Sequence, residues 1–116
     1  MLMGVLVRPV QAQTFTVLQS FAGQPNDGQR PDAPVTLDAG GNLYGTTYEG
    51  GSNNGGTVYK LTHRNSAWLY SSLYSFQGNN LGHGDGANPL AGVTLGPDGA
   101  VYGTTAAGGM GPCYHY

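Results

Sequence analysis

An internal repeat constrains the fold of this chain more than any other feature of its sequence. The tripeptide Val-Thr-Leu occurs at residues 35–37 and again at 93–95, and the tetrapeptide Tyr-Gly-Thr-Thr occurs at 44–47 and again at 102–105. Both pairs are separated by 58 positions, from 35 to 93 and from 44 to 102. A fixed spacing of this kind indicates that one structural unit is built twice along the chain.

The upstream part of each copy indicates where the units begin. Residues 18–21 (LQSF) resemble residues 73–76 (LYSF) at a spacing of 55 positions, from 18 to 73, which is three fewer than 58. The loop that follows is therefore three residues longer in the second copy. We assign the first repeat to residues 13–68 and the second repeat to residues 69–116.

Turn residues punctuate each copy at short intervals. The chain contains 21 Gly and 7 Pro among its 116 residues, and segments rich in β-branched and aromatic side chains lie between them. This pattern predicts short strands joined by tight turns. The strands expected through the first copy and into the second are Thr14–Phe21, Pro34–Leu37, Leu43–Thr47, Gly56–Leu61 and Trp68–Phe76.

Four short antiparallel strands per unit, with aromatic residues at fixed places, are typical of a β-propeller blade. We therefore expect an all-β, antiparallel fold of two propeller-blade-like repeats of about four short strands, the second of them incomplete. The residues expected in the core are Val35, Leu37, Leu43, Val58, Leu61, Val93, Leu95 and Val101.

The composition excludes several classes of protein. Gly and Pro are too frequent for a coiled coil or a long-helix protein, and the single Cys cannot form a disulfide within the chain. Four basic and six acidic residues give a net charge of −2, which argues against nucleic-acid binding driven by charge. No nucleic-acid partner and no cofactor are expected.

The N-terminal residues allow two interpretations. Residues 1–7 (MLMGVLV) form an apolar run, and residues 10–12 (VQA) suit a signal-peptide cleavage site, although no basic region precedes the run. Residues 1–12 are either the remnant of a secretory signal peptide or an ordinary apolar strand. A bilayer span takes about 20 apolar residues, so the run is not expected to be a transmembrane segment.

Several short motifs carry a resemblance to a known family. Residues 41–47 (GNLYGTT) and 56–61 (GTVYKL) in the first copy, with 101–105 (VYGTT) and 108–109 (GG) in the second, resemble the GloVer (Gloeo/Verruco) tandem repeat. The resemblance covers residues 15–109. It implies an exported or surface-displayed bacterial protein with many tandem copies and a propeller-like β architecture. It implies no known enzymatic activity, so no catalytic residue is assigned.

The second copy departs from the family pattern at its end. Residues 110–116 (MGPCYHY) stand where the family has a strand like GTVYKL. We expect either a truncated or frameshifted repeat with an aberrant tail or a naturally short relative. Fewer than two complete units leave strand edges open to association, so the expected partners are other copies of the repeat, including a homo-oligomer.

Aromatic residues are the candidate ligand-binding positions. Tyr44, Tyr48, Trp68 and Tyr102 offer rings on which a carbohydrate could stack. Packing between repeats is the simpler explanation for rings that recur at fixed positions, because each ring buries a large apolar area.

Acidic loop residues are weak candidates for metal binding. Asp27 and Asp85 occupy equivalent loops, and His83 lies close to the second of them. Calcium needs six or more oxygen ligands, and zinc needs three or four well-spaced ligands. The sequence therefore predicts no metal site, and Asp is expected to act as a turn former.

The function expected first is that of a non-catalytic, exported or cell-surface repeat module with a structural or interaction role, as a fragment of a larger propeller-like protein. The alternative is a carbohydrate- or polymer-binding module that uses the aromatic rings. A hydrolase or lyase on a propeller scaffold is the least supported, since only Asp27, Asp85 and His83 speak for it.

Overall fold

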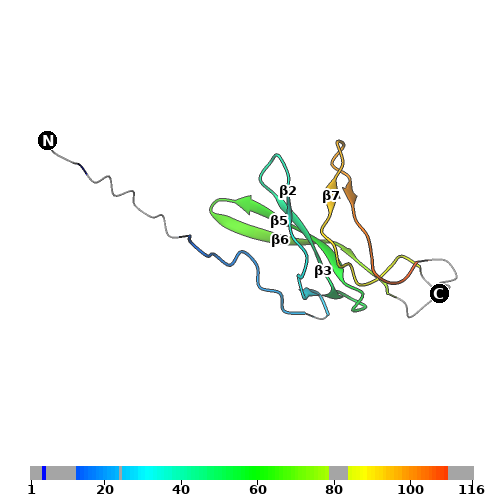
Figure 1. Ribbon diagram of the computed structural model, residues 1–116. Helices are drawn as coiled ribbons and strands as arrows, with labels where there is room; N and C mark the ends of the chain where they lie inside the picture. The colour runs from blue at the N-terminus through cyan, green and yellow to red at the C-terminus, as the bar shows by residue number, and fades with distance from the viewer. Residues whose placement is uncertain (1–3, 5–12, 24, 79–83, 110–116) are drawn as a thin grey trace.

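Short antiparallel strands make up all the regular secondary structure of the residues described by the computed structural model, which are 4, 13–23, 25–78 and 84–109 (Figure 1). This confirms the all-β, antiparallel class predicted from the sequence. The strands are β1 (Gly28–Gln29), β2 (Thr36–Leu37), β3 (Leu43–Thr47), β4 (Glu49–Gly50), β5 (Thr57–Arg64), β6 (Ala67–Ser75), β7 (Thr94–Leu95) and β8 (Val101–Tyr102).

A four-stranded sheet in the order β2-β3-β5-β6 is the largest element (Figure 1). Its neighbours are all antiparallel, and the register places Gly45 of β3 opposite Tyr59 of β5. β5 and β6 form a long hairpin that turns at Asn65 and Ser66, with φ angles of 47° and 66°. Two successive positive φ angles match the twist of a hairpin. The strand predicted to end at Leu61 continues to Arg64, so the turn before the next strand is shorter than the sequence predicted.

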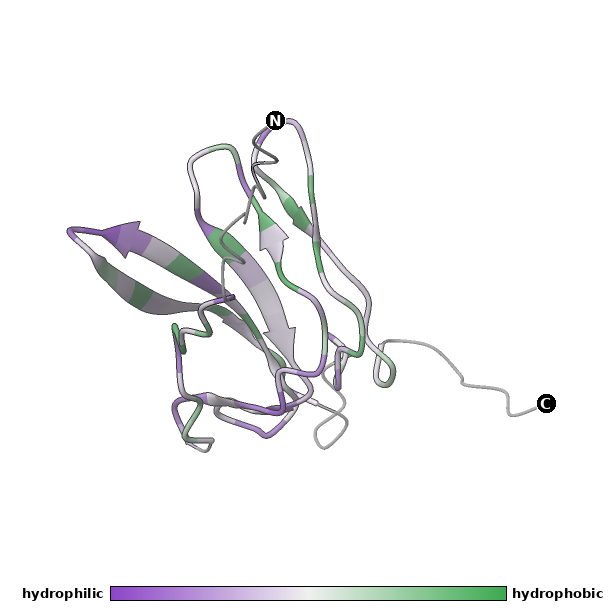
Figure 2. Cartoon of the chain, turned by 60° about the vertical axis from the view of Figure 1, so that its left-hand side comes forward, coloured by the Kyte–Doolittle hydropathy of each residue, from purple (hydrophilic) through white to green (hydrophobic). Residues whose placement is uncertain are grey.

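A second, two-stranded sheet of β7 and β8 lies beside the four-stranded sheet (Figure 2). It repeats the pairing of β2 with β3: Thr94 lies opposite Tyr102 as Thr36 lies opposite Tyr44. A bridge between residues 87 and 107 likewise repeats the pairing of residues 29 and 49 in β1 and β4. Each of these positions is shifted by 58, so the repeat in the sequence is a repeat in the strand pairing.

The backbone angles repeat as well. Arg30 has a φ of 60° and Asn88, its counterpart 58 positions later, has a φ of 55°. Residues other than Gly seldom adopt positive φ, so the coincidence is informative. The counterparts Gly50 and Gly108 have φ angles of 89° and 81°. The two repeats therefore share a local backbone conformation even where the residue types differ.

The core of the first repeat is aromatic. Tyr59 is 3% exposed, and its ring packs against Phe21 at 5.0 Å and against Tyr70 at 6.0 Å between centroids. Burial raises the pKa of both tyrosines above the usual value. The fully buried side chains beside them are Thr47 and Thr57, so the core combines rings with hydroxyl groups.

The predicted core is correct in part. Leu61 and Val93 are buried, whereas Val35 and Leu37 are 48% and 65% exposed. The prediction for Val35 and Leu37 is wrong because no element in the described part of the chain covers them. The other predicted members are half-buried: Leu43, Val58, Leu95 and Val101.

The strand predicted at Thr14–Phe21 is not formed. Phe15 is 91% exposed and Val17 is 62% exposed, and Phe21 alone joins the aromatic core. A β-strand needs a neighbouring strand edge to satisfy its backbone groups. In the described part of the chain, residues 13–20 pair with no such edge.

Some predictions concern residues at the ends of the chain. Residues 1–12, of which only residue 4 is described, and residues 110–116 lie outside the described residues, so the signal-peptide and aberrant-tail predictions stay predictions. The boundary between residues 68 and 69 also stays a prediction, although β6 runs across it. The described residues include no helix that is long and apolar enough to cross a membrane.

Candidate functional site at the face between the two repeats

The two repeats meet along one face of the four-stranded sheet. The hydroxyl of Thr36 donates to the carbonyl of Val93, and the hydroxyl of Thr46 donates to the carbonyl of Ala91 at 3.0 Å. Threonine side chains of β2 and β3 thus hold the backbone that leads into β7. Hydrogen bonds of this kind fix the position of the second repeat against the first.

The two valines of the repeated Val-Thr-Leu motif measure the effect of this contact. Val93 is 6% exposed, because it lies between the two sheets, whereas its counterpart Val35 is 48% exposed. The residue type and the place before the strand are the same in both. The difference in exposure therefore reports the presence of a neighbouring repeat on one side only.

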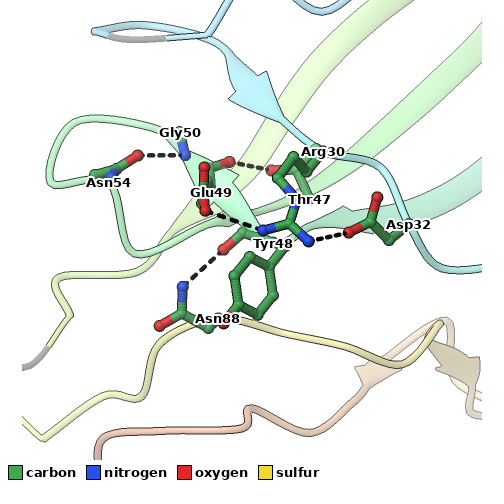
Figure 3. A network of polar contacts seen from close by, with 8 residues as sticks. All are labelled: Arg30, Asp32, Thr47, Tyr48, Glu49, Gly50, Asn54 and Asn88. Carbon is green, nitrogen blue, oxygen red and sulfur yellow. Dashed lines mark hydrogen bonds and ion pairs between the residues drawn. The ribbon is translucent and has the colours of Figure 1, made fainter.

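A polar network at one end of the sheet adds a second connection (Figure 3). The side-chain amide of Asn88 donates to the carbonyl of Tyr48 at 3.0 Å, and the backbone N–H of Asn88 donates to the carbonyl of Gly55 at 2.7 Å. The positive φ of Asn88 aims both donors at the first repeat. The second repeat is therefore anchored through one residue in a conformation that Asn tolerates better than most.

Arg30 lies at the centre of the same network (Figure 3). Its guanidinium contacts Glu49 at 3.1 Å and Asp32 at 3.0 Å, and it lies 4.5 Å from the centre of the Tyr48 ring. The hydrogen bond to Glu49, with the charge of Asp32, raises the pKa of Arg30 above its usual value. Ion pairs this exposed contribute little stability, so the network mainly orients the loop.

A cavity of about 520 Å³ lies between the two sheets. The first repeat contributes Thr46 and Val58, and the second contributes apolar groups and backbone, including Phe76, Val93 and Gly103. The walls are thus mainly apolar, and their polar residues are threonines, Tyr74 and Asp85. A cavity of this size is within the range of small-molecule sites. Its walls, however, come from both the first and the second repeat.

The comparison with known families decides the identity of the unit. The family model described as Gloeobacter/Verrucomicrobia repeat matches residues 3–113. The chain belongs to the Gloeobacter/Verrucomicrobia repeat family. This confirms the resemblance drawn from the Tyr-Gly-Thr-Thr motifs. No curated protein and no solved structure matches the chain.

In this Gloeobacter/Verrucomicrobia repeat, a cationic side chain lies over the ring at two of the predicted aromatic positions, Tyr44 and Tyr48. The ammonium of Lys60 lies 5.4 Å from the centre of the Tyr44 ring, and the Tyr44 hydroxyl donates to Asp38 at 3.2 Å. Hydrogen bonds donated to the Asp38 carboxylate hold its pKa below the usual value, and those from Asn42 have the largest effect. Tyr48 carries Arg30 on its ring.

The other two aromatic positions differ from each other. Trp68 stacks on His63 at 4.8 Å, at the far end of the β5–β6 hairpin. Tyr102 on β8 is 59% exposed. No ring contact joins any two of the four predicted positions in the described part of the chain. The structure therefore does not bring them together into one stacking surface.

The acidic candidates occupy equivalent places in the two repeats. The carboxylate of Asp27 accepts hydrogen bonds from the backbone N–H groups of Ala22 and Gly28, at 2.8 and 2.7 Å. Asp85 accepts from the N–H of Gln77, the counterpart of Ala22, at 3.0 Å, and from the Tyr74 hydroxyl at 2.8 Å. Both carboxylates thus close the loop that follows the Phe of each repeat.

The contact with Asp85 raises the pKa of Tyr74. Among the described residues, no group of three or more His, Cys, Asp or Glu side chains is arranged to hold a metal ion. His83, the third candidate, lies outside the described residues. No catalytic arrangement emerges from the acidic residues that the structure describes.

Sequence reasoning missed the residues that join the repeats. The sequence predicts Thr36 and Thr46 only as strand residues, because their role as donors depends on backbone 57 and 45 positions away. The available signal was that both threonines recur 58 positions later, as Thr94 and Thr104. Recurrence marks these positions, but the partner becomes visible only when the repeats are placed side by side.

Proposed function

We propose that this Gloeobacter/Verrucomicrobia repeat is a non-catalytic module of an exported or cell-surface protein, and that its role is to stack with further copies of the same repeat. The comparison of Val35 with Val93 carries the proposal. Val93 is buried by a neighbouring repeat and Val35 is exposed without one. Burying an aliphatic side chain of this size stabilises an assembly by about 1.5–3 kcal/mol.

The polar partners of the contact support the same arrangement. Thr94 and Thr104, the counterparts of the two donors Thr36 and Thr46, are exposed in the second repeat. Val35, whose counterpart Val93 provides an acceptor carbonyl, is exposed in the first repeat. The two ends of the pair of repeats therefore present complementary halves of one contact, which is the condition for head-to-tail association.

Export is supported by the sequence alone. The apolar residues 1–7 and the Val-Gln-Ala at 10–12 fit a secretory signal. The near-neutral composition and the family membership are compatible with a surface array. Recovery of the processed chain outside the cell, with its N-terminus at residue 13, is the expected result of expression with the native N-terminus in a bacterial host.

The oligomeric state tests the stacking role. Light scattering after size-exclusion chromatography is expected to show the mass of the full chain rising with concentration. Val35→Glu should return the chain to the monomer mass, because a carboxylate would be buried in the contact. Leu69→Glu is the matched control, since Leu69 is 50% exposed at the far end of the β5–β6 hairpin. A monomer at all concentrations, or equal effects of both variants, contradicts the proposal.

Carbohydrate binding is the alternative, and the exposed ring of Tyr102 is the observation that favours it. A soluble-glycan screen separates the two functions. Binding of a glycan that is lost in Tyr102→Ala, by a chain that stays monomeric, supports the alternative. An absence of glycan binding together with self-association supports stacking.

A further inference from the structure

The ring of Tyr59 covers a glycine in the first repeat. A Cβ added to Gly45 would lie 2.5 Å from the Tyr59 hydroxyl oxygen and 2.6 Å from the adjacent ring carbon, so only glycine fits beneath the ring. The Tyr59 ring also packs on Phe21 in a T-shaped contact, at 5.0 Å between centroids. Tyr59 therefore fills the space between a glycine of its neighbouring strand and the Phe that precedes the Asp27 loop.

The same two wall residues recur in the second repeat. Gly103 is the counterpart of Gly45, shifted by 58, and Phe76 is the counterpart of Phe21, shifted by 55. Both line the cavity of about 520 Å³. A Cβ added to Gly103 would meet only Val93 Cγ1, at 3.5 Å, which is an ordinary contact. The second repeat thus has the glycine and the phenylalanine of such a seat. In the described part of the chain the Tyr74 ring packs against Phe76 at 5.1 Å between centroids, and no ring lies over Gly103.

The edge of β8 matches the edge of β3 that β5 occupies. β3 pairs with β2 on one side and with β5 on the other. β8 pairs with β7, and in the described part of the chain no strand lies along its other edge. An unpaired edge presents N–H and C=O groups that an extended segment can satisfy.

Two further contacts of β5 have their counterparts in place. Thr57, two residues before Tyr59, bonds to Thr47 at 2.8 Å between hydroxyl oxygens. The counterpart of Thr47 is Thr105, which also lines the cavity. Lys60, the residue after Tyr59, lies over Tyr44, and the counterpart of Tyr44 is the exposed Tyr102. These two counterparts would receive a threonine and a lysine on either side of the tyrosine.

We propose that the edge of β8 along which no described strand lies, with the cavity beside it, forms a binding site for an extended segment with the pattern Thr-x-Tyr-Lys, supplied by another repeat. The tyrosine lies over Gly103 and against Phe76, the threonine bonds to Thr105, and the lysine lies over Tyr102. This inference rests on the proposed stacking role and names the segment that completes the second repeat. The contact is continuous with the face that already joins the two repeats.

A peptide binding experiment on the full chain tests the site. The probe is a fluorescent ten-residue peptide with the sequence of residues 55–64 (GGTVYKLTHR), and the readout is anisotropy. Saturable binding is expected. A peptide with Tyr59→Ser should bind about tenfold more weakly or worse, since it lacks the ring that fills the cavity.

Variants of the protein locate the binding. Gly103→Val should weaken peptide binding by about tenfold or more, because its side chain occupies the seat of the ring. Ala106→Val is the matched control, since Ala106 is exposed and is not among the cavity-lining residues. Circular dichroism should show that Gly103→Val keeps the wild-type spectrum, as its Cβ has room in the free chain.

Each other outcome overturns the inference. Absence of binding, or equal binding of the wild-type and Tyr59→Ser peptides, shows that the cavity takes no tyrosine. Binding that Gly103→Val leaves unchanged places the peptide elsewhere, for example on β5 itself. Self-association that Gly103→Val abolishes, with no peptide binding, assigns the site to a whole second copy. Because stacking is tested separately through Val35→Glu, failure of either proposal can be told from failure of the other.

Discussion

Replacing Thr47 with Val should destabilise the first repeat strongly, although the two side chains have nearly the same shape. Thr47 is fully buried, and its hydroxyl makes three hydrogen bonds. It donates to the carbonyl of Glu49 at 2.9 Å, and it accepts from the backbone N–H of Thr57 at 3.1 Å and from the hydroxyl of Thr57 at 2.8 Å. One donor and two acceptor sites are all that a hydroxyl offers, so every one of them is used.

The expected loss follows from these three bonds. At about 1 kcal/mol of net stability per hydrogen bond, Thr47→Val costs about 3 kcal/mol. In a domain of this size, 1 kcal/mol corresponds to about 4–8 °C, so the melting temperature should fall by about 12–24 °C. Thr47→Ser keeps the hydroxyl and removes one methyl group, so it should lose only about 1 kcal/mol.

Thermal unfolding followed by circular dichroism measures the effect, and Thr105→Val provides the control. Thr105 is the counterpart of Thr47 in the second repeat, where it is half-buried at the wall of the cavity. The control should melt within a few degrees of the wild type. A Thr47→Val variant that melts with the wild type, or that loses no more than Thr105→Val, would refute the assignment of stability to the buried hydroxyl.

Four further outcomes are expected. Gly45→Ala should lose about 1–3 kcal/mol because its methyl group overlaps the Tyr59 ring, whereas Gly103→Ala should be neutral or gain up to about 1 kcal/mol; equal melting temperatures would contradict this. Tyr70→Phe should change the free energy of unfolding in urea by no more than about 1 kcal/mol, because the buried Tyr70 hydroxyl makes no hydrogen bond of standard geometry among the described residues, although Thr57, Ser72 and Asp27 lie close enough to affect its pKa; a larger loss would show that one of these side chains bonds the hydroxyl. Burial raises the pKa of Tyr59 and Tyr70. The stability that depends on their neutral form is therefore complete below about pH 10 and is lost as the pH rises through the raised pKa values. A melting temperature that does not change up to about pH 12 would contradict this prediction. The lowered pKa of Asp38 gives stability above the usual Asp value of about 3.9 that is lost as the pH falls through the lowered one, and Asp38→Ala should remove that acid dependence of the melting temperature.

The features that the sequence predicted best are those decided by neighbouring residues. The strand expected at Leu43–Thr47 has those bounds in the structure, and its counterpart β8 forms the equivalent pairing. Both strands follow turns whose Gly residues, Gly41 and Gly99, have φ angles of 83° and 81°. Turn formation depends on a few neighbouring residues. A motif that occurs twice in the chain therefore forms the same hairpin twice.

The predictions that failed depend on contacts between distant segments. Thr14–Phe21 has the composition of a strand, but composition does not supply the neighbouring edge that a strand requires. Val35 and Val93 both begin a Val-Thr-Leu segment, and only the adjacent repeat buries the second of them. The ion pair of Arg30 with Glu49 joins residues 19 positions apart, and no sequence motif predicts it.

The place of β6 in the fold couples the two repeats in folding. The last three residues of β6 and the Phe76 that follows them match residues 18–21 at the start of the first repeat, yet β6 forms the last strand of the sheet that the first repeat begins. The coupling energy between units of a repeat array comes from their shared interface, and here that interface includes the pairing of the part of β6 from Leu69 to Ser75 with β5. One unit therefore cannot unfold without removing a strand from its neighbour. An array of such units should lose its structure in a single cooperative step, where arrays joined by side chains alone fray from their ends.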